Sequence, residues 1–230
     1  MKHITESIIG RKGSGGTNGT NNILMPHACK DVDGNVYDAV KIGNQVWMAE
    51  NLRTEHFRNG EEIPLSNRYT GFDASRYHPG GSLEQAGYLY NWNTVNDSWD
   101  LAPKGWHVPS NEEFEELRDF IKSHPEFLAD SNKPYTVGKC LASKDGWRHS
   151  SLQNAIGNDP DLNNSIGFNA YPVGFWSDHL GGSGRWTGFW SATRSNSREA
   201  YVWRLDSDSS GLNRNTYGLD QGFSVRCVRD

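Results

Sequence analysis

The sequence predicts an α+β domain that is rich in loops. Three observations support this prediction: 25 glycines against nine prolines in 230 residues, one segment with a strong helix signature, and segments that alternate between apolar and polar residues as strands do. Hydrophobic residues make up only 35% of the chain, so the nine Trp, nine Tyr and nine Phe must fill much of the core. This length favours one main domain.

The first 22 residues are expected to lie outside that domain. Residues 3–11 match a short amphipathic helix, and the GSGGTNGTNN that follows has the composition of a flexible linker. A helix this short is not stable alone, so the peptide is either disordered or docked on another molecule. The domain is therefore expected to span residues 23–230.

The domain is predicted to open with a β-hairpin. Asp33-Gly34 and Gly43-Asn44 are turn signals, and the runs VYDAVKI and QVWMAE alternate as strands do. The acidic DVDGN stretch resembles the start of a calcium loop. We prefer a turn, because the bidentate glutamate that such a loop needs on a following helix is missing.

A helix is predicted over PSNEEFEELRDFIKSH. Ser110 is the N-cap, Glu113 completes a capping box, and Phe114, Leu117 and Ile121 form the apolar face. The glutamates near its start are interpreted as a solvated face that complements the helix dipole, not as a catalytic cluster.

The C-terminal third is predicted to end in a β-hairpin. Residues 167–195 are interpreted as irregular loops between short strands, and the alternating runs 200–208 and 222–230 as two strands joined by a long polar loop. In the first run, Tyr201, Trp203 and Leu205 share one face and are expected in the core.

The opposite face of that strand and its polar neighbours form the candidate ligand surface. Arginine and tyrosine are favoured at binding hot spots, and tyrosine offers contact area at low entropy cost. An ordinary polar hairpin face is the alternative. The candidate ligand-binding residues are Arg194, Arg198, Val202, Arg204, Asp206, Asp208, Asn213, Asn215, Tyr217 and Trp186. Trp176 and Trp186 are also candidates for stacking on sugar rings, whereas Trp190 is expected in the core.

Charge and hydropathy exclude some partners. The net charge of −5 and pI near 5.9 make nucleic acid an unfavourable partner. No apolar run is long enough to span a membrane, and the start lacks the apolar region of a signal peptide. A mature protein whose signal had been removed would look the same, so virion and exported locations both stay open.

No catalytic, metal or cofactor site is predicted. Cys29, Cys140 and Cys227 lack the spacing of a zinc knuckle, and buried thiols are preferred over one disulfide plus a free thiol. His107 has no nucleophile at a recognisable spacing and is expected to be a packed, structural ring. Phosphate-binding loops and hydrolase motifs are missing from the sequence. The chain is therefore not expected to be an enzyme.

Several motifs resemble one family in the family's own order. GNQVWMAENL, GYLYNWNTV, LAPKGWHVPSNEEFEEL, GFNAYPVGFW, GFWSAT and GFSVRCVRD are similar to the Fibrobacter succinogenes major paralogous domain family over about residues 31–230. The resemblance implies a C-type-lectin-like fold, also similar to the formylglycine-generating enzyme superfamily. Cysteine chemistry of the latter kind is not supported, because Cys140 has no nearby base and Cys227 lies in an alternating strand.

The C-terminus also resembles variable proteins of diversity-generating retroelements. Those systems mutate template adenines, so asparagine codons become a mixture that residues 194–220 contain. The resemblance implies that Phe189–Thr193 and Gly222–Asp230 are a constant framework. It leads us to expect a phage tail-tip adhesin that binds a protein or glycan of a target cell. Its N-terminal peptide would dock on the virion, and a homotrimer is one option for its assembly by analogy with virion fibres. The alternatives are a surface or secreted binding module of a Bacteroidota cell and, least favoured, a formylglycine-generating-type enzyme.

Overall fold

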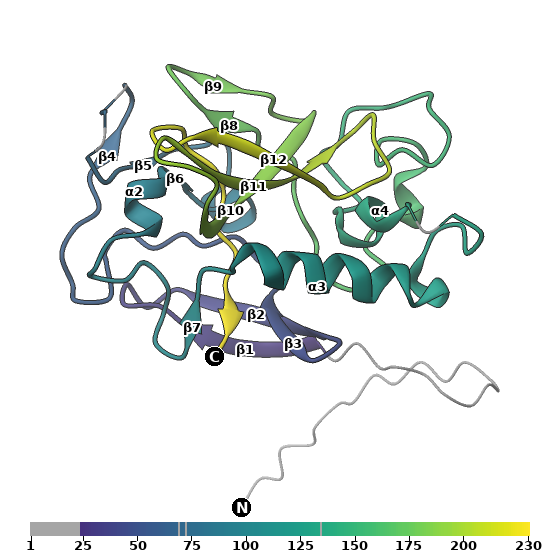
Figure 1. Ribbon diagram of the computed structural model, residues 1–230, viewed down its shortest axis with the longest axis horizontal. Coiled ribbons are helices and arrows are strands. Elements are labelled where there is room, and N and C mark those ends of the chain that lie inside the picture. The colour runs from purple at the N-terminus through teal and green to yellow at the C-terminus, as the bar shows by residue number, and fades with distance from the viewer. Residues whose placement is uncertain (1–23, 69, 72, 134) are drawn as a thin grey trace, which may run out of the picture.

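The computed structural model describes residues 24–68, 70–71, 73–133 and 135–230, and the peptide predicted over 1–22 lies outside this part. Many short strands and few helices give an α+β fold that is mostly β structure (Figure 1). Two larger sheets form the framework of the fold. The helices are α1 (Leu83–Ala86), α2 (Trp92–Val95), α3 (Asn111–Lys122) and α4 (Val137–Leu141), with 3-10 turns at Pro125–Phe127 and Pro160–Leu162.

The first sheet joins the beginning and the end of the domain. Its strands, in spatial order, are β1 (Leu24–Lys30), β2 (Val36–Ile42), β3 (Gln45–Met48), β13 (Val228–Arg229) and β7 (Trp106–His107). The predicted hairpin is confirmed, since β2 and β3 pair antiparallel. The Asp31 carboxylate accepts hydrogen bonds from Asn35 and Tyr37, so the acidic stretch folds as a turn.

The second sheet is formed by the C-terminal third. Its order is β10 (Trp186–Arg194), β11 (Glu199–Asp206), β12 (Asn213–Gly218), and both pairings are antiparallel. The smaller sheets contain β4 (Leu65–Ser66), β5 (Arg76–Tyr77), β6 (Leu89–Tyr90), β8 (Phe175–Trp176) and β9 (Leu180–Gly181).

Two sequence predictions for this region are wrong. Residues 222–230 do not pair with β11: they cross to the first sheet as β13, and β12 forms inside the predicted polar loop. The nine-residue β10 also replaces part of the loops expected over 167–195. A polar edge strand such as β12 shows no apolar alternation, because water covers most of its side chains.

The predicted helix is confirmed as α3, which lies between the two large sheets (Figure 1). Ser110 Oγ accepts a hydrogen bond from the backbone N–H of Glu113, and the Glu113 carboxylate accepts one from the backbone N–H of Ser110. The buried Phe114 contacts Trp47 of β3 at 5.0 Å and stacks on Trp203 of β11 at 5.6 Å. The helix therefore holds the two sheets in a fixed relation.

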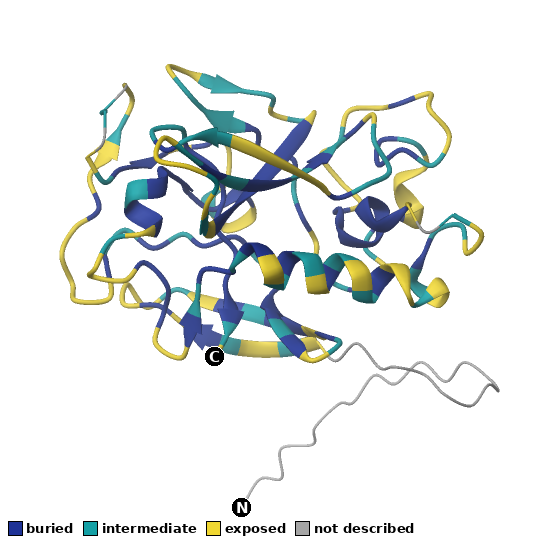
Figure 2. Cartoon of the chain, viewed as in Figure 1, coloured by how far each residue is buried: buried dark blue, intermediate teal, exposed yellow. Residues whose placement is uncertain are grey.

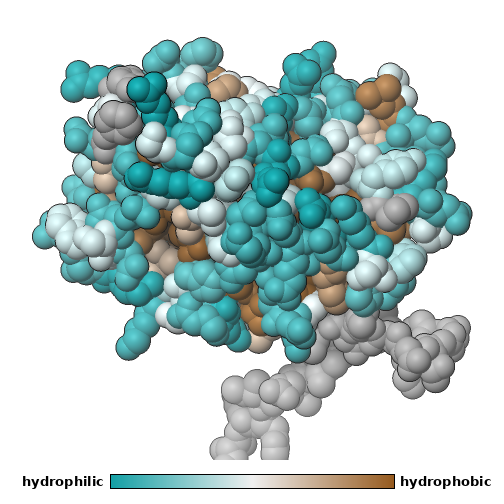
Figure 3. Space-filling view, in the orientation of Figure 1, coloured by the Kyte–Doolittle hydropathy of each residue, from teal (hydrophilic) through white to brown (hydrophobic). Residues whose placement is uncertain are grey.

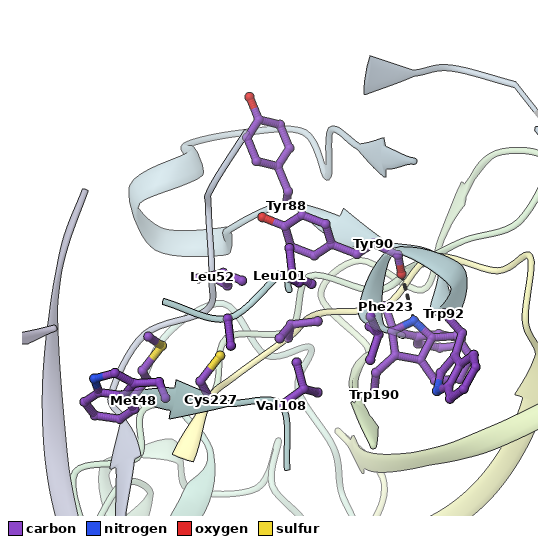
Figure 4. Close-up of a cluster of buried hydrophobic side chains, with 14 of the residues drawn as sticks. Met48, Leu52, Tyr88, Tyr90, Trp92, Leu101, Val108, Trp190, Phe223 and Cys227 are labelled. Atoms are coloured by element: carbon purple, nitrogen blue, oxygen red, sulfur yellow. Dashed lines mark hydrogen bonds between the residues drawn. The ribbon is translucent and has the colours of Figure 1, made fainter. Parts of the chain in front are cut away.

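Buried side chains lie on both faces of the second sheet (Figure 2). One cluster, with α3, contains Phe189, Trp203 and Leu205. The other contains Trp190 and Phe223, and there the Trp190 indole donates to the carbonyl of Tyr90 at 2.7 Å (Figure 4). Trp190 is fully buried, as predicted.

All three cysteines are buried and free, as the preferred interpretation predicts. Burial raises the pKa of the Cys29 thiol to about 12 and that of Cys140 to about 11. Burial also raises the pKa of Cys227. These thiols stay protonated at neutral pH and are poor nucleophiles.

Candidate functional site

The register of the second sheet places most of the candidate ligand-binding residues on one face. Arg204 of β11 is directly opposite Asn213 of β12, and Val202 is opposite Asn215. Along the other edge of β11, Asp206 is directly opposite Trp186 of β10. Residues that are directly opposite in a sheet project to the same face. Three strands therefore contribute to a single surface, which we call the Arg204 face.

Arg204 is held in place from several directions. Its guanidinium lies 4.3 Å above the Trp186 ring, donates to Tyr217 Oη at 3.3 Å and forms an ion pair with Asp206. Partial burial opposes the charge, but the hydrogen bonds that the guanidinium donates to Tyr217 and Asp206 leave the pKa of Arg204 above its ordinary value. The side chain is thus charged and preorganised, which lowers the entropy that a bound ligand would have to remove.

An open concavity of about 320 Å³ lies on this face. It is lined by Arg185, Arg204, Asp206, Asp208, Ser209, Asn213 and Asn215. Two arginines and two aspartates balance in formal charge, and Arg185 approaches Asp208 to 4.0 Å. The walls offer hydrogen-bond donors and acceptors close together, which suits a polar, uncharged ligand surface.

Two candidates need correction. Val202 is completely buried because β11 is the central strand and its even-numbered face is covered by Phe223 and Trp190 at that point. Trp186 is only 7% exposed, since it stacks on Phe175 at 4.5 Å and lies under Arg204. Val202 therefore does not belong to the surface, and Trp186 supports it from below.

Two other candidates lie away from the concavity. Arg194 ends β10 and sits 4.6 Å over the Trp92 ring, and Arg198 lies in the turn that leads into β11. Both side chains are exposed. Tyr201, predicted in the core with Trp203, is only half-buried and lies 5.1 Å below the Arg214 guanidinium.

The structure adds Arg185 and Ser209 to the concavity. Neither belongs to the alternating pattern of β11, because Arg185 precedes β10 in a glycine-rich turn and Ser209 follows β11. Only the pairing of the strands brings them next to Asn213. No signal in the sequence indicates this proximity.

The sequence interpretation expected the His107 ring to be packed among aromatic side chains. The structure does not place it there. Its Nε2 lies 2.7 Å from Glu113 Oε1 and its Nδ1 lies 2.8 Å from Asp230 Oδ1. Partial burial opposes protonation, but these two hydrogen bonds raise the pKa of His107 above its ordinary value. The imidazole links β7, α3 and residue 230, which is a structural use of the histidine.

The surface around α3 and β12 is mostly hydrophilic, with only small hydrophobic patches (Figure 3). Within the described ranges, no helix is long and apolar enough to cross a membrane.

The family profile of the Fibrobacter succinogenes major domain matches residues 40–229. The chain therefore belongs to this family, as the motifs predict. Comparison with curated proteins finds no match. Comparison with solved structures also finds none.

Proposed function

We propose that this protein binds a ligand through the Arg204 face and is not an enzyme. The observation that carries the proposal is the gathering of Arg204, Asp206, Asn213 and Asn215 around one open concavity by the β11–β12 register. These side chains project from strands that are anchored by a core on the opposite face. A rigid scaffold with changeable polar side chains suits recognition.

The proposal includes a C-type-lectin-like fold and a C-terminus that tolerates diversification. Two features support the fold assignment: the first and last strands, β1 and β13, share one sheet, and the C-terminal sheet ends in the exposed edge strand β12. The exposure of Arg198, Asp208 and Asn213 supports tolerance to change. The biological role that follows is an adhesin at a phage tail tip, with a cell-surface protein or glycan as its target. A Bacteroidota surface module would use the same face.

Single substitutions test whether this face binds the ligand. The full chain is incubated with intact candidate host cells and with their purified surface polysaccharides. We expect Arg204→Ala and Asn215→Ala to weaken retention strongly, whereas Lys41→Ala, on the exposed side of β2, leaves it unchanged. Equal retention of all three variants would contradict the proposal, provided that their thermal unfolding is alike.

Population sequencing tests the diversification. The gene's C-terminal codons are sequenced with flanking DNA across many isolates of the source organism. The proposal predicts changes at exposed positions between residues 194 and 220, beside a near-identical template repeat. An invariant segment without a template would favour a surface module of fixed specificity.

A further inference from the structure

A second pocket, of about 270 Å³, lies between α3 and the start of β12 (Figure 1). Arg118 and Lys122 of α3 and Arg214 of β12 contribute to its lining. We call it the α3–β12 pocket. Its lining residues include three cations and no acidic side chain, whereas the concavity on the Arg204 face is lined by two arginines and two aspartates. The two neighbouring sites therefore differ in charge.

Aromatic rings of β11 support two of these cations. The Arg118 guanidinium lies 5.2 Å from the centroid of the Trp203 ring, and the Arg214 guanidinium lies 5.1 Å from that of Tyr201. Trp203 and Tyr201 are two residues apart on one strand, so both rings project from the same face of β11. This face therefore positions cations that come from two different elements, α3 and β12.

The three cations keep hydrogen-bond donors that a ligand can reach. Among the described residues, Arg118 donates only from Nε, to Asp119, and Arg214 only from Nη1, to Glu115. Lys122 Nζ lies 3.8 Å from the Asp119 carboxylate, which is beyond hydrogen-bond distance. The side chains of Lys122 and Arg214 are 42% and 43% exposed. Three cations beside two carboxylates leave one net positive charge and several free N–H groups.

The α3–β12 pocket adjoins the concavity on the Arg204 face, because Asn213 lines both. The loop that joins β11 to β12 is anchored to α4, since the N–H of Gly138 donates to the Ser210 carbonyl at 2.8 Å. A Cβ on Gly138 would lie 2.8 Å from the carbonyl oxygen of Gly211, so only glycine allows this approach. The boundary between the two sites is therefore firmly held, and one extended ligand can occupy both.

The exposed groups at both sites favour a glycan over a protein as this ligand. Protein interfaces centre on large apolar side chains that become buried on binding. Among the described residues, no large exposed hydrophobic side chain lines the Arg204 concavity, and Tyr135 alone lines the α3–β12 pocket. The Tyr135 ring is 52% exposed, which suits stacking on a sugar.

We propose that the α3–β12 pocket binds the carboxylate of an acidic sugar residue, so that the ligand of the Arg204 face is an acidic polysaccharide. The inference rests on the proposed function, because the same polymer passes Asn213 to reach the Arg204 concavity. Guanidinium groups of Arg118 and Arg214 donate to the carboxylate, and Lys122 adds a positive charge. A volume of about 270 Å³ is at the small end of ligand pockets and suits one ring.

The test uses one polysaccharide in two forms. The probe is the acidic fraction of the surface polysaccharides of candidate host cells, before and after chemical reduction of its carboxylates to alcohols. We expect reduction to weaken retention by the full chain about tenfold or more. Lys122→Gln and Arg214→Gln should each weaken retention of the untreated fraction about tenfold, the value of one charged hydrogen bond, and should hardly affect the reduced fraction.

Lys41→Gln is the matched control, because it removes one positive charge from an exposed position on β2 and should not change retention. Weakening by this control as large as that by Arg214→Gln would indicate general attraction to a polyanion and overturn the proposal. Equal retention of both forms of the polysaccharide would overturn it too. So would retention of whole cells without retention of any polysaccharide, which would indicate a protein ligand.

Arg204→Ala separates this inference from the proposed function. If Arg204→Ala abolishes retention while Lys122→Gln and Arg214→Gln leave it unchanged, the Arg204 face binds and only the acidic-sugar site is refuted. If all three variants retain the polysaccharide as the parent protein does, the proposed function fails as well. Thermal unfolding of each variant distinguishes loss of binding from loss of folding.

Discussion

Adjacent residues of β11 serve different purposes. Trp203 is fully buried against Phe114, and Arg204, the next residue, lies on the exposed face. The alternation of the strand predicts this difference from sequence alone. It does not predict the burial of Val202, because the parity rule assigns a face to a side chain but cannot say what covers that face. This depends on Phe223, which comes from a distant part of the chain.

The Trp203 side chain is predicted to contribute to stability and that of Asn215 to binding alone. Trp203→Ala leaves a cavity in the core and should lower the free energy of unfolding by about 3–5 kcal/mol. Asn215→Ala removes an exposed side chain and should change it by about 0.5 kcal/mol or less. Urea unfolding measures both. Similar values for the two variants would mean that the assignment of faces is wrong.

Arg226 is expected to be as important to the core as a large apolar side chain. Its guanidinium lies between Phe168, at 4.3 Å, and Phe189, at 5.2 Å, and donates twice to Asn51 Oδ1 and once to the Phe168 carbonyl. Burial lowers the pKa of Arg226 to about 9, so the group stays largely charged at neutral pH.

Arg226→Met removes these hydrogen bonds and leaves buried acceptors unpaired, which should cost about 2 kcal/mol or more. Arg229→Met provides the control, because Arg229 is only half-buried beside Trp106. Denaturant titration should show a large loss for the first variant and a small one for the second. Equal losses would rule out a special role for Arg226.

At the scale of elements, α3 could be predicted and β12 could not. The helix carries its own signals in Ser110, Glu113 and the spacing of Phe114 and Leu117. The strand β12 has no such signal, because its four leading residues are exposed and its place depends on pairing with β11. Three of the candidate residues, Asn213, Asn215 and Tyr217, lie on this strand, so the sequence predicted these residues but not their arrangement.

The capping box of α3 should be measurable. Ser110→Ala removes the acceptor for the Glu113 N–H and should lower the free energy of unfolding by about 0.5–2 kcal/mol. Ser197→Ala, at an exposed position before β11, is the control and should have little effect. Thermal unfolding of both variants decides the matter: a Ser110→Ala protein as stable as its parent would exclude a contribution from the cap.

His107 should make stability depend on pH. Because the folded pKa of His107 is raised above the ordinary 6.5, its contribution is fully present below that value and disappears as the pH rises through the higher folded value. The difference in Tm between the parent protein and His107→Gln should therefore shrink as the pH rises from below 6.5 through the raised folded pKa. A difference that stays constant would mean that protonation of His107 does not contribute.

At the scale of the whole molecule, motifs that indicate the family meet around one buried contact. Asn51 belongs to GNQVWMAENL, Phe168 to GFNAYPVGFW and Arg226 to GFSVRCVRD, and these three residues are joined by the hydrogen bonds of the guanidinium. Sequence similarity therefore identified the framework. It could not locate the Arg204 concavity, because residues from separate segments line it.

The central claim is that the exposed part of the C-terminal sheet can change while the framework stays folded. The most direct test is a display library in which Arg198, Asp208, Asn213 and Asn215 are randomised together. A second library randomises Val202, Trp203 and Leu205. The library is treated with a protease, and the members that survive are identified by sequencing. Survival reports that a member is folded. We predict that most members of the first library stay resistant and most of the second do not. Widespread unfolding in the first library would contradict the account.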